Sequence, residues 1–300
     1  MDKKLITVLG PTAIGKTNLA IKLANHFDTE IISADSRQFF KEMQIGTAVP
    51  TAEEQQRAPH HFIQHISIDD HYNVGQYEQD ALTKIEELFK THDILILVGG
   101  SGLYVDAVIN GLDYFPNIDP TVRKEVRETF GGKDIQRAQE KLKTLDPVYY
   151  QQVDLSNGQR VLRALEVCIS SGRPYSSFLE KRKPKRPFLP LKIGLTTERS
   201  IIYDRINKRV DLMMQEGLEN EARHLFPYRE NNALNTVGYK ELFNYFEGNY
   251  DKKTAVAEIK KNTRRFAKRQ LTWFRKDTEI YWFDLTTDFH KVVKFIEDQL

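Results

Sequence analysis

Short apolar runs alternate with amphipathic stretches over the first hundred residues. Residues 5–9 and 93–98 are mostly Ile, Leu and Val, and residues 30–34 form a shorter run of the same kind. Between them, residues 17–27 and 81–89 repeat apolar side chains at helical spacing. Alternating helices and continuously apolar strands are typical of a parallel sheet covered by helices on both faces. The pattern therefore predicts an α/β fold.

The pattern changes after residue 112. Between residues 113 and 190 strand-like runs disappear and helical spacing dominates, and the segment closes with a basic, proline-broken run at 181–187. A strand pattern returns at residues 191–195, and residues 200–275 are mostly helical. We therefore predict that residues 1–112 and 191–300 form an α/β core with C-terminal helices, and that residues 113–190 form a helical insertion domain.

A glycine-rich loop follows the first predicted strand and opens the first predicted helix. It matches the pattern G-x-x-x-x-G-K-S/T, in which backbone N–H groups and a helix N-terminus surround phosphate oxygens. The lysine adds a positive charge beside the phosphates, and the threonine hydroxyl suits Mg²⁺. The candidate phosphate-binding residues are Gly10, Pro11, Thr12, Ala13, Ile14, Gly15, Lys16 and Thr17. The loop predicts a P-loop NTPase-like core with a diphosphate- or nucleotide-binding (ATP-binding) site, and leaves open which molecule carries the phosphates.

Two further segments should reach the same edge of the sheet, because ligands of open parallel sheets bind beyond the carboxyl ends of the strands. Asp35 follows the second predicted strand and is suited to act as a Mg²⁺ ligand or a general base. An aspartate in a strand-end turn explains it equally well. Residues 99–102, Gly-Gly-Ser-Gly, follow the third strand, where an ordinary strand–helix turn is the slightly better explanation from the residues alone.

The charge of the chain is small in total but unevenly distributed. The 300 residues contain 44 Lys+Arg and 42 Asp+Glu, a formal net charge of +2. Residues 1–159 hold 16 basic and 23 acidic side chains, whereas residues 160–276 hold 26 basic and 13 acidic ones. The basic part is either a set of solvated helix faces or a surface for a phosphate backbone, and we favour the second hypothesis.

Several other classes of protein are disfavoured. The single cysteine, Cys168, excludes an intramolecular disulfide and a Cys-rich zinc site, fits a reducing cytoplasm, and lies on an apolar helical pattern typical of a packing thiol. His60, His61 and His65 lack partners at the spacing of a zinc site. No apolar run approaches the length of a membrane span, and the first residues have no signal-peptide core. We expect a cytoplasmic protein without membrane attachment.

Eight segments of the chain occur together and in an order that identifies a family. The segments are residues 10–17, 33–38, 43–48, 59–62, 97–104, 159–166, 237–241 and 264–273. With them the chain resembles the tRNA isopentenyltransferases from about residue 5 to 285, and the combination is highly specific although no single segment is. One departure is Phe40, where many relatives carry a tyrosine, so a polar role there is weakened.

The resemblance implies an activity. It implies transfer of a dimethylallyl group from dimethylallyl diphosphate to N6 of adenosine 37 in tRNAs that read codons beginning with U. The loop would hold the diphosphate leaving group rather than ATP, with Mg²⁺ as cofactor at Thr17. Asp35 would accept the N6 proton, with Thr12 close to the same chemistry. The implied partner is the tRNA anticodon stem-loop, and we expect a monomer without an obligate protein partner.

The resemblance also implies which residues meet tRNA. The target base must be flipped out of the stacked loop, and the helical insertion is expected to hold the anticodon stem. The candidate tRNA-binding residues are Asp35, Ser36, Arg37, Gln38, Ser101, Arg123, Gln159, Arg160, Val161, Leu162, Arg163, Lys240, Phe266, Lys268, Arg269, Gln270 and Trp273. Ser101 stands where the family usually has threonine, and the hydroxyl is kept. From the residues alone, packing of the last helix explains Phe266 and Trp273 better than base stacking does.

Two alternative functions are weighed against this one. A small-molecule P-loop kinase would turn over ATP and would not need a long basic half. A nucleic-acid-binding ATPase should carry a second acidic motif at a strand end, whereas Asp93 precedes its strand. Incorporation of label from dimethylallyl diphosphate into tRNA, as opposed to consumption of ATP, separates the three hypotheses.

Overall fold

The chain forms two compact units in a computed structural model that describes residues 3–132, 135–179 and 185–300. The core unit comprises Met1–Ile109 and Arg186–Leu300, and the insertion unit comprises Asn110–Lys185. The core resumes before the boundary predicted at residue 191, because Pro190 already pairs with Leu5 in the sheet. Residues 180–184 of the predicted basic run lie outside the described residues.

The core unit is built on a parallel sheet of six strands. The strands are β1 (Lys4–Leu9), β2 (Ile31–Ser33), β3 (His60–His61), β4 (Ile94–Val98), β5 (Leu189–Thr196) and β6 (Tyr281–Asp284). Their order is β3-β2-β4-β1-β5-β6, and every neighbouring pair is parallel. This confirms the predicted α/β fold and its four apolar strands. The edge strands β3 and β6 were not predicted, because one has two residues and the other is only half-buried.

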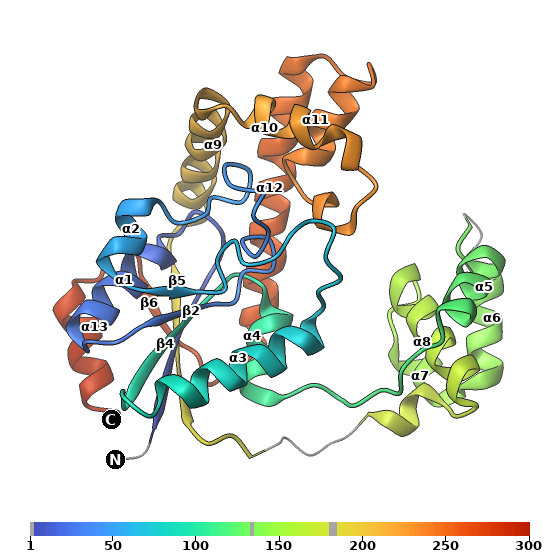
Figure 1. Ribbon diagram of the computed structural model, residues 1–300, viewed down its shortest axis with the longest axis horizontal. Helices are drawn as coiled ribbons and strands as arrows, with labels where there is room; N and C mark the ends of the chain where they lie inside the picture. Colours follow the sequence, from blue (N-terminus) through green and yellow to red (C-terminus); the bar gives the residue numbers. More distant parts are fainter. Residues whose placement is uncertain (1–2, 133–134, 180–184) are drawn as a thin grey trace. The chain divides into compact units, whose positions relative to one another are not determined.

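Helices cover both faces of the sheet (Figure 1). One face packs on α3 (Val74–Leu88) and α4 (Gly102–Asn110), and the other on α1 (Lys16–His26) and α13 (Phe289–Glu297). Successive residues of a strand point to opposite faces, so Leu5 lies in the first of these layers and its neighbour in the second. Burial on both faces explains why the strand sequences are continuously apolar.

A helical group completes the core unit. It contains α9 (Arg199–Glu216), α10 (Leu218–Leu225), α11 (Tyr239–Phe246) and α12 (Lys252–Phe274), with two 3₁₀ turns, η2 (Phe226–Tyr228) and η3 (Asn232–Leu234). The short helix α2 (Ala52–Arg57) lies elsewhere in the unit. Leu218, Tyr239 and Leu242 are fully buried in the apolar centre of the group. Within the described residues, no helix is both long and apolar enough to cross a membrane.

The insertion unit is helical throughout its described residues. It contains α5 (Pro120–Phe130), α6 (Gln136–Leu145), α7 (Pro147–Gln152), α8 (Gly158–Ser171) and the 3₁₀ turn η1 (Tyr175–Phe178). Val126, Leu142 and Leu165 meet in its own apolar core. The strongly amphipathic helix α8 is capped by the side chain of Asn157 and ends at Gly172, whose φ of 67° is left-handed.

Candidate active site

The glycine-rich loop joins β1 to α1 at the carboxyl end of the sheet. Gly10 and Gly15 have φ angles of 144° and 103°, a backbone conformation that favours glycine. Ala13 and Ile14 are buried against α9 and α12, and this packing holds the loop in its curved conformation. Because Gly15 has no side chain to cap α1, the N–H groups of the first turn remain for an anionic ligand.

Lys16 is held back against the loop. Its Nζ donates to the Pro11 carbonyl at 2.9 Å. Burial lowers the pKa of the Lys16 ammonium to about 8, while Asp35 raises it and Arg209 lowers it further. The ammonium therefore sits in a pocket that lacks enough negative charge, and a diphosphate would supply that charge.

The segment after β2 carries Asp35 to the same end of the sheet. The Asp35 carboxylate accepts the backbone N–H of Arg37 at 3.2 Å. The guanidinium of Arg37 donates in turn to the carbonyls of Asn232 and Ala233, at 3.1 and 2.8 Å. These hydrogen bonds connect the segment beside Asp35 to residues that follow it by 195 and 196 positions in the sequence.

The neighbouring predicted residues are also fixed by hydrogen bonds. The Ser101 Oγ accepts the backbone N–H of Ser36 at 3.1 Å, and the two hydroxyl oxygens are 3.1 Å apart. The Gln38 amide donates to the carbonyls of Thr47 and Ala48 at 3.2 and 2.9 Å. The hydroxyl at position 101 therefore joins the loop after β4 to the segment that carries the carboxylate.

Gln270 of α12 connects the glycine-rich loop to the loop after β4. Its Oε1 accepts the backbone N–H of Thr12 at 2.9 Å, and its Nε2 donates to the Gly100 carbonyl at 2.8 Å. Gln270 is buried, and a Cβ on Gly100 would overlap its amide. The side chain therefore positions two loops of the site and is less available to an RNA ligand than the sequence suggested.

The aromatic residues of α12 divide into two groups. Phe274 is buried in the core, whereas Phe266 and Trp273 keep 38% and 36% of their surface exposed. The Trp273 indole N–H donates to the Asp106 carboxylate at 3.0 Å, and a Cβ on Gly102 would overlap the ring. Trp273 is thus fixed against α4 and keeps part of its ring open to solvent.

Two adjoining cavities of the core unit collect most of the predicted residues. The first, of about 600 Å³, is lined among others by Thr12, Ala13, Gly15, Lys16, Thr17, Asp35 and Gln38. The second, of about 560 Å³, is lined among others by Thr12, Asp35, Ser36, Arg37, Ser101, Lys240, Phe266, Arg269, Gln270 and Trp273. Thr12 and Asp35 border both cavities. The phosphate loop and the aromatic wall therefore face two spaces that share part of their lining, including the Thr12 hydroxyl and the Asp35 carboxylate.

The sequence did not single out two arginines of α9 that belong to this site. The Arg205 Nε donates to the Ala13 carbonyl at 2.7 Å and so braces the glycine-rich loop. Arg209 borders both cavities, and burial lowers the pKa of its guanidinium, with Arg205 lowering it further. Their four-residue spacing puts them on one helix face, but many other basic residues share the region, so spacing alone could not identify them.

The structure bears on the metal and thiol candidates as well. Among the described residues, no three His, Cys, Asp or Glu side chains are grouped to hold a metal ion. His61 pairs with Glu30 at 2.6 Å. Cys168 is buried and its pKa is raised by burial, as expected of a packing thiol. Thr17 and Asp35, which the sequence offered as Mg²⁺ ligands, both line the first cavity.

The predicted tRNA-binding residues of the insertion unit differ in exposure. Gln159 and Arg160 are exposed on α8, but Val161 and Leu162 keep only 0% and 8% of their surface and pack in the apolar core. Those two side chains hold the unit together and present almost no surface to a ligand. Arg163 is partly exposed. The helical spacing of apolar residues indicates that Val161 and Leu162 are buried. The family motif had named all of residues 159–163 as RNA-binding and did not separate the buried residues from the exposed ones.

The remaining predicted residues lie on exposed surface. Lys240 and Arg269 are exposed and line the second cavity, and Lys268 is exposed beside them on α12. Arg123 of α5 is half-exposed in the insertion unit. Each is placed where a polyanion could reach it within its own unit.

Comparison with known proteins identifies relatives along the whole chain. A sequence model of the family described as IPP transferase matches residues 38–277. A tRNA dimethylallyltransferase of Christiangramia forsetii is 57% identical over 300 residues, which cover 100% of this chain and 99% of the relative. A second, from Bacteroides fragilis and called tRNA dimethylallyltransferase 1, is 47% identical over 281 residues, 94% of this chain and 93% of the relative.

Solved structures agree with the sequence comparison. The tRNA isopentenylpyrophosphate transferase of Bacillus halodurans has a TM-score of 0.72 at 37% identity and covers 99% of this chain and 95% of its own. A eukaryotic dimethylallyltransferase acting on tRNA has a TM-score of 0.80 at 23% identity, with 99% and 80% covered, which supports the fold alone. The predicted family is confirmed by the match over residues 38–277 and by full-length identity of 57%: the chain belongs to the IPP transferase family.

Proposed function

We propose that the protein transfers a dimethylallyl group from dimethylallyl diphosphate to N6 of adenosine 37 in tRNAs that read codons beginning with U, releasing diphosphate. One observation carries the proposal: a cavity lined by a phosphate loop meets a second, aromatic-walled cavity at Thr12 and Asp35. A diphosphate ester on one side and a flipped base on the other would place their reacting atoms together. The names of the full-length relatives support the same reaction.

The bond changes assign roles to the residues between the cavities. The N6 nitrogen attacks the allylic C1, the N–C bond forms, and the C1–O bond breaks. The electron pair of that bond leaves with the diphosphate, whose growing charge is stabilised by the loop N–H groups, Lys16 and Arg209. The proton released from N6 goes to the Asp35 carboxylate, and the Thr12 hydroxyl borders the same point.

Mg²⁺ is proposed as the cofactor. The first cavity offers the hydroxyl of Thr17 and the carboxylate of Asp35, hard oxygen donors of the kind Mg²⁺ takes together with substrate phosphates and water. Thr17 is the proposed ligand. Bound there, the ion would neutralise charge on the diphosphate.

The second cavity is proposed to take the target base. An adenine must leave the stacked anticodon loop before its N6 can be reached, and a flipped base needs a pocket with stacking surfaces. Phe266 and Trp273 offer such surfaces, and Lys240 and Arg269 offer charges for the flanking phosphates. We assign the anticodon stem to the insertion unit, through Arg123, the exposed part of residues 159–163, and the shape of an A-form helix.

The cellular setting is proposed on the same basis. A tRNA-modifying activity and a single buried thiol suit the cytoplasm, and the two cavities are each complete within one chain. We therefore propose a cytoplasmic monomer without an obligate protein partner.

A transfer assay tests the function. Unmodified tRNA transcript, labelled dimethylallyl diphosphate and Mg²⁺ are incubated with the full chain, and the RNA is digested to nucleosides. The expected result is label on the adenosine next to the anticodon, and none on a transcript with guanosine at that position. ATP consumption without label on the RNA would instead favour a kinase or an RNA-dependent ATPase and overturn the proposal.

A further inference from the structure

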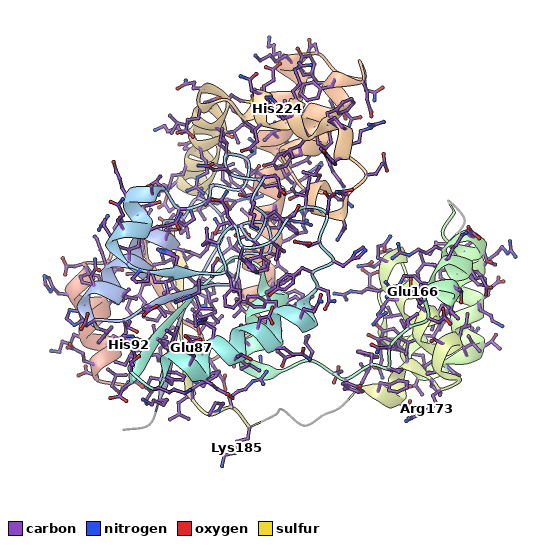
Figure 2. The ribbon with its side chains drawn as sticks, viewed as in Figure 1. Glu87, His92, Glu166, Arg173, Lys185 and His224 are labelled. Carbon is purple, nitrogen blue, oxygen red and sulfur yellow. The ribbon has the colours of Figure 1, made fainter. Side chains whose placement is uncertain are left out.

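Two carboxylates are buried among the described residues of the insertion unit. The Asp146 carboxylate accepts hydrogen bonds from the Tyr149 N–H and from the Ser176 N–H and hydroxyl, whereas the carboxylate of Glu166 faces arginines. Glu166 of α8, marked in Figure 2, keeps 4% of its surface although its neighbours Val161, Leu162 and Leu165 are apolar core residues. Burying a carboxylate is costly unless charged partners compensate it. An alanine or leucine would serve packing alone at this position, so the carboxylate needs another explanation.

Three arginines surround that carboxylate. The Nε atoms of Arg127 and Arg123 lie 3.4 and 3.6 Å from its oxygens, and the Nη1 of Arg163 lies at 3.5 Å. The side chain of Glu166 is 5% exposed, whereas those of the arginines are 49%, 60% and 41% exposed for Arg123, Arg127 and Arg163. One negative charge faces three positive ones, so the cluster keeps an excess of two positive charges on its outer side.

The arrangement of the arginines favours binding of a second anion. Arg123 and Arg127 are four residues apart on α5, where like charges repel each other across one helical turn. Both approach Glu166 through Nε and keep about half of their side-chain surface exposed, so each guanidinium can also face another acceptor. The Arg163 guanidinium also stacks on the Phe115 ring at 5.9 Å, which limits its movement.

The outer face of α5 carries a shallow, open hollow beside the cluster. Its volume is about 410 Å³, and its described lining comes from α5: Pro120, Arg123, Lys124, Arg127 and Glu128. Lys124 adds a further positive charge, which Glu128 pairs with only loosely at 3.8 Å. The ligand that fits planar, half-exposed guanidinium groups around such a hollow is a phosphate group.

We propose that Glu166 is a positioning residue that holds Arg123, Arg127 and Arg163 as one preorganised site for a phosphate of the RNA backbone. The inference rests on the proposed function in taking the phosphate to be that of tRNA. It adds Arg127 and Glu166 to the binding surface: the arginines contact the RNA, and Glu166 acts only through them. The excess charge of the cluster is neutralised when the phosphate binds.

The test uses a substitution for which the two explanations predict opposite changes in RNA affinity. Loss of a negative charge alone should strengthen binding, whereas loss of the positioning contact should weaken it. Glu166→Gln removes one negative charge, as does Glu125→Gln at an exposed position of α5. If the arginines act as loose charge, both variants of the full chain should bind an anticodon stem-loop RNA slightly more tightly than the wild type. If Glu166 positions them, Glu166→Gln should bind about tenfold more weakly, the effect of losing charge-assisted hydrogen bonds, while Glu125→Gln should not.

A second pair of variants covers the case in which Glu166→Gln unfolds the insertion unit. Arg127→Lys keeps the charge but cannot contact Glu166 and a phosphate with one planar fork, whereas Arg137→Lys makes the same change at an exposed position of α6. Weaker RNA binding by Arg127→Lys alone is expected. Equal binding by the two lysine variants would overturn the proposal, as would wild-type or tighter binding by a folded Glu166→Gln.

Steady-state kinetics separates this proposal from the proposed function. Glu166→Gln should raise the KM for tRNA about tenfold and leave kcat and the affinity for dimethylallyl diphosphate unchanged, since the cluster touches RNA and not the reacting atoms. A fall in kcat at saturating tRNA contradicts the positioning role. If the wild type binds the RNA but transfers no dimethylallyl group, the proposed function fails, while the binding comparison still decides the role of Glu166.

Discussion

The two units of the chain build their functional surfaces in different ways. In the core unit, Gln270 joins Thr12 and Gly100 across sequence separations of 258 and 170 residues. In the insertion unit, the arginine cluster is drawn from two neighbouring helices and faces Glu166, at sequence separations of 43 residues for Arg123, 39 for Arg127 and three for Arg163. The core fixes reacting atoms through long-range packing, whereas the insertion organises charge around one buried anchor. Substitutions beside the reacting atoms of the core should therefore change the rate, whereas substitutions in the arginine cluster of the insertion should change RNA affinity.

The largest effect is expected at the carboxylate between the cavities. Asp35→Asn keeps the shape of the side chain but removes the proton acceptor, and should lower the single-turnover transfer rate by about 10²–10⁴-fold. RNA affinity should stay at the wild-type value. Equal losses of rate and affinity would mean that Asp35 has a structural role, which would break the division between the two units.

The next largest effect is expected at Arg209, which borders both cavities. Arg209→Gln removes a charge proposed to stabilise the leaving diphosphate, and should lower kcat/KM for dimethylallyl diphosphate by about 10²–10³-fold. Arg199→Gln, at an exposed position of the same helix, is the matched control and should be near neutral. Similar kinetics for the two variants would remove Arg209 from the active site.

The third prediction separates packing from RNA contact in the insertion. Leu162→Ala should lower the free energy of unfolding of the insertion unit by about 2–5 kcal/mol, because Leu162 is buried in its core. Thermal unfolding followed by circular dichroism measures the loss, and dimethylallyl diphosphate binding provides the control. Weaker RNA binding without any loss of stability would show that the Leu162 side chain meets the RNA.

The smallest effect concerns pH and Lys16. Below pH 8 the ammonium is protonated in the empty site, since its pKa is about 8. Above that pH, Lys16 must take up a proton from solvent when diphosphate binds. The affinity for diphosphate should therefore fall by up to about tenfold per pH unit. Calorimetric titration between pH 7 and 9.5 measures the slope, which Lys16→Met should flatten. A constant affinity across that range contradicts the lowered pKa.

Local patterns account for the parts that the sequence predicted well. The strands β1, β4 and β5 are largely buried on both faces, so their residues are mostly apolar, with Thr7 and Lys192 as buried exceptions. The phosphate loop has a fixed spacing because glycines stand at positive φ. The insertion was predicted because it lacks strands. Edge strand β6 was missed because it is half-exposed and carries a mixed sequence.

Residues that depend on distant partners could not be predicted in the same way. Arg209 has no local signature, and it is assigned to the site because it lines both cavities, as Asp35 does. Gln270 lies in a motif, but its contact with the phosphate loop exists only after α12 packs on the core. Glu166 also lies in a motif, but its proposed role in positioning arginines depends on its burial beside three of them, which the sequence does not show. Val161 and Leu162 are the opposite case. They lie in a motif predicted to bind tRNA, yet they are buried core residues next to exposed ones.

The most direct test of the division between the units is single-turnover dimethylallyl transfer measured over a range of tRNA concentrations. Wild type, Asp35→Asn and Glu166→Gln are compared in one experiment, with label counted on the adenosine next to the anticodon. We predict that Asp35→Asn stays slow at every RNA concentration, and that Glu166→Gln reaches the wild-type rate once RNA is saturating. Recovery of Asp35→Asn at high RNA, or failure of the wild type to label that adenosine at all, would contradict the account.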